Sequence, residues 1–61
     1  MALENLPKDN MMLLSFVNTR LRDDGINLDS FCRQFDTAKG SIIKRLDSIG
    51  YTYNEDLNKF I

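Results

Sequence analysis

The segment Leu28–Gly50, LDSFCRQFDTAKGSIIKRLDSIG, decides the fold that this sequence predicts. Its apolar residues recur at spacings of three and four, which places them on one face of a helix. They form two runs, Leu28, Phe31, Cys32 and Phe35, then Ile42, Ile43, Leu46 and Ile49. Because the polar segment 36–38 separates the runs, we expect two short helices joined by a tight break. Asn27 is a suitable N-cap for the first helix, and the second covers roughly residues 39–49.

A longer helix is predicted before this segment, over residues 10–23. Its apolar stripe consists of Met11, Leu14, Val17 and Leu21, widened by Leu13 and Phe16. Asp9 is a suitable N-cap, and Gly25 provides the stop because glycine readily adopts the left-handed conformation past a helix end. We therefore expect residues 1–9 to form an N-terminal tail and residues 10–61 to form a single small domain.

The pattern changes to a period of two at residues 51–53, where two tyrosines flank a threonine, as in a strand. The next three residues, Asn-Glu-Asp, favour a turn. We expect a C-terminal β-hairpin with its loop at residues 54–57, which places Tyr51 opposite Phe60. Two strands alone are marginally stable, so Ile26 is expected to add a very short third strand. A fourth short helix in place of the hairpin is the alternative.

The segment Leu28–Gly50 resembles a helix-turn-helix, in which Cys32 stands where a small residue lets two helices approach each other. It departs from that pattern at two places. Asp36 replaces the usual glycine of the turn, and Ala38 replaces the usual serine or threonine cap, which leaves Thr37 as the capping candidate. The resemblance implies a mainly α fold, a three-helix helix-turn-helix-like domain whose C-terminal β-hairpin makes it similar to a minimal winged helix.

In a helix-turn-helix the second helix reads nucleic acid. The outward residues of that helix, and hence the candidate nucleic-acid-binding residues, are Lys39, Ser41, Lys44 and Arg45. The three cations can neutralise phosphates, and an arginine can also pair with guanine. This predicts a DNA-binding regulator. The same residues also fit the solvated face of an ordinary helix, and a net charge of −1 is unlike that of a dedicated nucleic-acid binder.

A second interpretation is a protein-interaction module without nucleic-acid binding, acting as a homodimer or an adaptor. The apolar run of residues 11–14, with Phe16, covers more of the helix than a core face needs. A hairpin also leaves a strand edge that a second copy can extend. The residues expected to face a partner are Met12, Phe16, Tyr51 and Phe60.

Catalytic chemistry has little support in the composition. The chain has 61 residues and no histidine, so the usual general base and most zinc sites are missing. Its single cysteine, Cys32, lies on an apolar helix face and is expected to be a core residue. We therefore expect a small binding protein that is not an enzyme and uses no cofactor, metal or small-molecule substrate. The absence of a long apolar run predicts no membrane span and a cytoplasmic location.

Nearly the whole chain also resembles a family of short bacterial proteins catalogued as a domain of unknown function, numbered forty-two fifty. The matching positions are Asn5–Asp9, Met12–Asn18, Leu21–Asp23, Leu28-Asp29, Cys32, Ile49–Tyr51, Tyr53–Glu55 and Leu57-Asn58. The resemblance implies a small helical protein and carries no activity with it.

Overall fold

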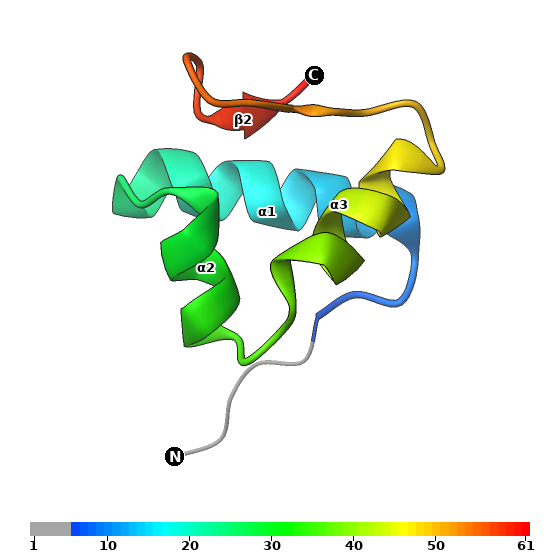
Figure 1. Cartoon of the computed structure of the whole chain (residues 1–61), viewed down its shortest axis with the longest axis horizontal. Coiled ribbons are helices and arrows are strands. Elements are labelled where there is room, and N and C mark those ends of the chain that lie inside the picture. Colours follow the sequence, from blue (N-terminus) through cyan, green and yellow to red (C-terminus); the bar gives the residue numbers. More distant parts are fainter. Residues whose placement is uncertain (1–5) are drawn as a thin grey trace.

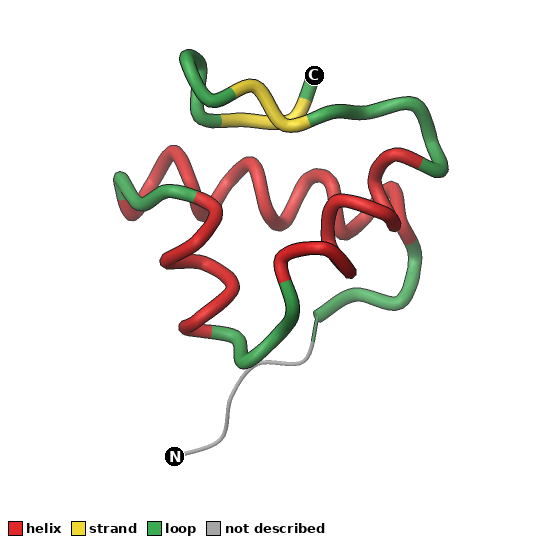
Figure 2. Tube along the Cα trace, in the orientation of Figure 1, coloured by secondary structure: helices red, strands yellow, loops and turns green. Residues whose placement is uncertain are grey.

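The computed structural model describes residues 6–61 as three helices followed by a two-stranded antiparallel sheet (Figures 1 and 2). In chain order they are α1 (Asn10–Asp24), α2 (Leu28–Gln34), α3 (Lys39–Asp47), β1 (Tyr53–Asn54) and β2 (Lys59–Phe60). The predicted mainly α fold with a C-terminal hairpin is confirmed. The alternative of a fourth helix is wrong.

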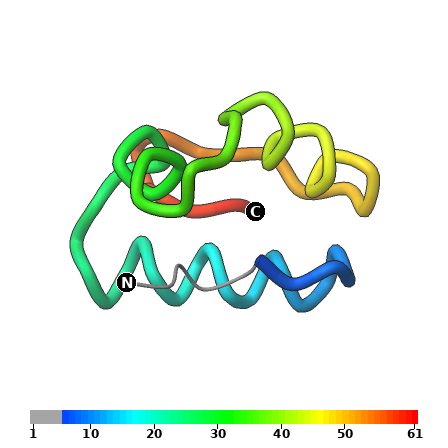
Figure 3. Tube along the Cα trace, turned by 90° about the horizontal axis from the view of Figure 1, so that it is seen from below, coloured from blue at the N-terminus to red at the C-terminus, as the bar shows by residue number. Residues whose placement is uncertain are grey.

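The longest helix, α1, forms one side of the molecule, and α2, α3 and the hairpin lie together across from it (Figure 3). Apolar side chains from all these elements meet between the two layers and are buried there. The core consists of Leu13, Val17, Leu21, Leu28, Phe31, Cys32, Ile42, Leu46 and Phe60. Because the partners of α1 within residues 6–61 all lie on one side, these residues leave its opposite face uncovered.

Local capping fixes the helix ends as the sequence predicts. The Asp9 carboxylate accepts a hydrogen bond from the Met12 amide at 3.0 Å, and the Asn27 side chain accepts one from the Ser30 amide at 2.8 Å. Gly25 ends α1 in the left-handed conformation, with a φ of 64°. These caps satisfy amides that a helix start leaves unpaired, so they set where α1 and α2 begin.

The turn between α2 and α3 keeps a glycine-like geometry although it contains no glycine. Asp36 adopts a left-handed φ of 52°, and the Thr37 amide donates to the Cys32 carbonyl at 2.9 Å, which closes the end of α2. The expectation that Thr37 caps α3 is wrong. Ala38 holds the N-cap position and provides no side-chain acceptor.

We expect the substitution Asp36→Gly to stabilise the protein by about 0.5–1 kcal/mol. A left-handed backbone is strained for a residue with a Cβ and unstrained for glycine. The free energy gained by relieving this strain exceeds the cost of the extra entropy that glycine loses on folding. The free energy of unfolding in urea measures the effect. As a control, Asp47→Gly makes the same exchange on the helical backbone of α3 and is expected to destabilise. A loss of stability in Asp36→Gly would contradict the argument.

The register of the hairpin differs from the predicted one because its loop lies one residue later in the chain. Tyr53 lies opposite Phe60, so the expected pairing of Tyr51 with Phe60 is wrong. The rings of the actual pair are 5.3 Å apart between centroids. The loop falls one residue later because the Asn54 side chain accepts a hydrogen bond from the Leu57 amide, and Asn58 takes the left-handed conformation that closes the turn.

Besides the packing of Phe60 in the core, one side chain of α1, Asn18, forms hydrogen bonds with the hairpin. Its amide nitrogen donates to the Phe60 carbonyl at 3.1 Å, and its oxygen accepts from the Phe60 amide at 2.8 Å. Among the described residues the sheet has two strands, so the expected third strand at Ile26 is wrong. Asn58 instead donates its side-chain amide to the Ile26 carbonyl at 2.8 Å. Side chains thus replace the third strand.

Candidate functional site

Lys39 and Ser41, the first two candidate nucleic-acid-binding residues, are exposed at the start of α3. The Lys39 ammonium lies 3.1 Å from a carboxylate oxygen of Asp29 on α2. That hydrogen bond and the charge of Asp29 raise the pKa of Lys39 above its ordinary value. A phosphate would have to compete with Asp29 for this cation.

Arg45 has a structural role. Its guanidinium donates to the Pro7 carbonyl at 2.7 Å, the Lys8 carbonyl at 2.8 Å and the Asn10 side chain at 2.9 Å. These bonds tie α3 to the segment before α1, where Leu6 also packs on the core. Residues 6–9, expected in the tail, are therefore integrated into the domain. The rest of that predicted tail, residues 1–5, lies outside the described residues.

We expect Arg45→Lys to lower the free energy of unfolding by about 1–2 kcal/mol. A planar guanidinium holds three acceptors at fixed angles, whereas an ammonium is a compact point charge that cannot reach them together. Lys44→Arg, an exchange at the exposed neighbouring position, is the control and should change stability by less than about 0.5 kcal/mol. Equal stability of Arg45→Lys and the wild type would show that the carbonyl contacts contribute nothing.

Lys44 remains as an exposed cation with no hydrogen bond or ion pair to any residue of the described segment 6–61. Over α2, α3 and their turn, however, the exposed charges cancel. The cations are Arg33, Lys39 and Lys44, and the carboxylates are Asp29, Asp36 and Asp47. Among the described residues, the excess positive charge of these elements is therefore one, from half-buried Arg45, whose guanidinium is held by the Pro7 and Lys8 carbonyls.

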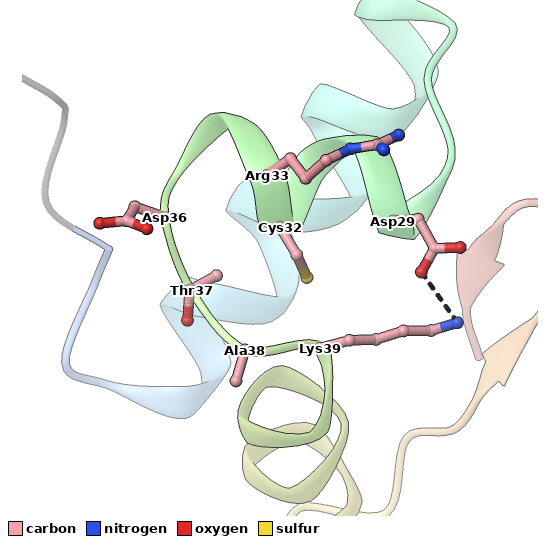
Figure 4. Close-up of a pocket in the computed structure, with 7 residues that line it drawn as sticks. All are labelled: Asp29, Cys32, Arg33, Asp36, Thr37, Ala38 and Lys39. Carbon is pink, nitrogen blue, oxygen red and sulfur yellow. Dashed lines mark ion pairs between the residues drawn. The ribbon is translucent and has the colours of Figure 1, made fainter.

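A cleft of about 600 Å³ lies between α2 and the start of α3 (Figure 4). The Cys32 thiol reaches its floor, while the side chains of Arg33 and Asp36 point away from the thiol. Cys32 is 5% exposed, and burial and the nearby Asp29 raise its thiol pKa. The burial of Cys32 confirms the prediction that it is a core residue. A protonated, buried thiol is also a poor nucleophile.

We expect the raised thiol pKa to make the protein less stable in alkaline solution. The unfolded chain releases the Cys32 proton near the ordinary pKa of 9.0, while the folded chain retains it to a higher pH. The contribution to stability is therefore complete below pH 9.0 and is lost as the pH rises through the folded pKa. The stability difference between wild type and Cys32→Ala, measured from about pH 8 to 10, isolates this contribution. A difference that stays constant would contradict it.

The four predicted partner-facing residues occupy different environments. Met12 is 63% exposed on the uncovered face of α1, and Phe16 is half-buried beside it against the rings of Phe31 and Phe35. Tyr51 is half-buried, and Phe60 is 2% exposed. The expectation that Phe60 faces a partner is therefore wrong, because the hairpin turns this ring into the core.

A groove of about 870 Å³ runs between α1 and β2. It extends along α1 from Met11 to Arg22 and continues to Gly25, and residues of the hairpin form its opposite wall. Its side chains include two large exposed apolar residues, Met11 at 53% and Leu57 at 56%. The full lining is Met11, Leu14, Ser15, Asn18, Thr19, Leu21, Arg22, Gly25, Leu57, Asn58 and Lys59.

A second, smaller depression of about 340 Å³ lies on the other flank of α1. Met12 and Phe16 line it together with Pro7, Ser15 and Thr19. Ser15 and Thr19 border both hollows, so the short side chains of α1 form a low ridge between them. The outer face of α1 is therefore uneven, and its two hollows are more apolar than polar, as protein-binding surfaces often are.

A family model described as a domain of unknown function (DUF4250) matches residues 7–60. The chain belongs to this family. Neither a curated protein nor a solved structure matches the chain. The matched range agrees with the extent of the folded unit. Near its start Arg45 donates to the Pro7 carbonyl, and near its end Phe60 belongs to the core.

Two further findings concern this DUF4250 chain. Within residues 6–61, histidine, cysteine, aspartate and glutamate side chains nowhere form a group of three that could hold a metal ion. No helix in the described part of the chain is long and apolar enough to span a bilayer.

Sequence reasoning did not find the groove: it placed Met11 in the core stripe and expected Met12 and Phe16, which line the smaller depression, to face a partner. The run that includes Met11 was predicted to exceed the needs of the core. Leu57 and Lys59 gave no comparable signal, because they come to α1 only through the hairpin register and the bonds of Asn18. The sequence signal that could have indicated this wall is Leu57, an isolated leucine in a turn-rich segment, which the structure shows to be exposed.

Proposed function

We propose that this chain is a small non-catalytic binding module that docks a protein partner in the groove between α1 and β2. The observation that carries the proposal is that the groove is lined by two large exposed apolar side chains, Met11 near the start of α1 and Leu57 in the hairpin loop. Large exposed apolar residues along a concave surface commonly mark a site for another protein.

The rigidity of the groove supports the same proposal. One wall is a helix of 15 residues, and the other is joined to it by both bonds of Asn18 to Phe60. Because the two walls are fixed relative to each other, the surface is preorganised. Little conformational entropy of the groove is therefore lost when a partner binds. From Met11 to Arg22 the groove follows α1 for roughly 17 Å, which suits a helix of about three turns.

A helix-turn-helix regulator is the second candidate function. The observation in its favour is the turn of residues 35–38 between α2 and α3, with the left-handed Asp36 at the position where the motif usually has glycine. Against it stand the balanced charges of this face and the structural engagement of Arg45. We therefore rank nucleic-acid binding below protein docking.

Amide chemical shifts distinguish the two functions. Isotope-labelled protein is titrated at low salt with amphipathic helical peptides of acidic, neutral and basic character, and separately with a random DNA duplex. We expect one or more peptides to shift amides of the groove, including those of Ser15 and Leu57, while the duplex leaves α3 unchanged. A duplex that shifts α3 and dissociates as salt rises, with no response to any peptide, would replace docking with DNA binding.

A further inference from the structure

We propose that the segment docked in this groove is an acidic amphipathic helix. The inference depends on the proposed docking function and adds the chemistry of the partner. Three features of the groove lead to it: the sign of its charge, the closed edge of its strand wall and the kind of apolar residues that it exposes.

Among residues 6–61, the charged side chains that line the groove are two cations, Arg22 on α1 and Lys59 on β2, and none is a carboxylate. This contrasts with the whole chain, whose net charge is −1, and with the balanced face of α2 and α3. Arg22 is 3.2 Å from Asp23, but the side chains of this pair are 78% and 57% exposed, so water weakens the attraction. Both cations are available to carboxylates of a partner.

The strand wall of the groove cannot take an additional strand at Phe60. Thr52 and Ile61 exchange both of their backbone hydrogen bonds, so the next pair, Tyr53 with Phe60, directs its peptide groups outward. On the groove side, Asn18 already satisfies the amide and the carbonyl of Phe60. A partner therefore has no backbone groups to pair with there. It must bind through side chains, which favours a helix over an extended peptide.

The apolar residues of the groove suit a helix that presents a hydrophobic stripe. Met11 and Leu57 both line the groove, and half-buried Leu14 lies on the core side of Met11, away from the ridge. Methionine is unbranched and adapts to irregular surfaces, so this wall can fit leucine or phenylalanine side chains of a partner. Carboxylates on either side of that stripe would then face Arg22 and Lys59.

The test uses three designed helical peptides with the same leucine stripe and with glutamate, glutamine or lysine on both sides of it. Dissociation constants are measured by fluorescence anisotropy at low and high salt, and amide shifts locate each peptide. We expect the glutamate peptide to bind about fivefold more tightly than the glutamine peptide, as two exposed ion pairs would provide, and to lose this advantage at high salt. The lysine peptide should bind most weakly.

Charge reversal supplies the decisive variant. Arg22→Glu combined with Lys59→Glu changes exposed residues only, and should reverse the order so that the lysine peptide binds best. Lys44→Glu reverses one charge on α3, outside the groove lining, and serves as the control, which should keep the order of the wild type. Thermal unfolding of each variant shows that the fold is intact.

The outcomes separate this inference from the function on which it depends. Groove shifts of equal size and affinity for all three peptides would retain the docking function and reject the acidic partner. Absence of groove shifts with every peptide would reject the docking function itself. If the groove amides instead shift with the concentration of the protein alone, and light scattering gives twice 7.1 kDa, the occupant is a second copy and the acidic helix is rejected.

Discussion

Replacing Phe60 with alanine is expected to remove a large part of the protein's free energy of unfolding. Phe60 is 2% exposed and contributes the hairpin's ring to the core, and truncating a buried phenylalanine costs about 3–5 kcal/mol. A domain of this size has a total stability of about 3–9 kcal/mol. The loss is therefore a large part of what holds the fold together, and it should appear as a broad loss of helical circular dichroism on mild warming.

The adjacent residue provides the control for this substitution. Ile61 is 52% exposed, so Ile61→Ala should change the free energy of unfolding by less than about 0.5 kcal/mol. If Phe60→Ala retained the stability of the wild type while the hairpin amides alone exchanged with solvent, the helices would form an independent unit. The view of the hairpin as part of the single core would then be wrong.

The elements that were predicted correctly depend on local chemistry. Asp9 and Asn27 cap helices with side chains that reach only three residues along the chain, and Gly25 ends α1 through its own backbone freedom. Interactions over such short separations can be read from neighbouring letters. The spacing of the apolar residues also predicts which face of each helix is buried. Eight of the nine core residues come from the predicted stripes of the three helices.

The parts that were predicted incorrectly depend on contacts between distant residues. The register of the hairpin was assigned from turn propensity, but Asn58 donates to Ile26, 32 positions away, and Asn18 bonds Phe60, 42 positions away. A single asparagine in a helix carries no sign that it will hold a strand. The same reasoning explains Arg45, which the pattern of α3 placed outward and which the structure directs to Pro7 and Lys8.

Replacing Asn18 with alanine is expected to lower the free energy of unfolding by about 2–3 kcal/mol. Two hydrogen bonds are lost, and the amide and carbonyl of Phe60 are left partly buried without a protein partner. Hydrogen exchange at the Phe60 amide should accelerate more than exchange in α1. Thr19→Ala, at the exposed position that follows, is the control and should be nearly neutral.

Asn18→Asp separates the two bonds by pH. The carboxylate can still accept from the Phe60 amide, but it faces the Phe60 carbonyl with a second acceptor in place of the donor. Protonation restores an O–H donor, so the folded state raises the pKa of this carboxyl above its ordinary value of about 3.9. The stability that the protonated carboxyl restores is present below the ordinary pKa of about 3.9 and is lost as the pH rises through the raised pKa of the folded state. The deficit of Asn18→Asp relative to wild type should therefore shrink in acid, and a deficit independent of pH would mean that the Phe60 carbonyl does not need this donor.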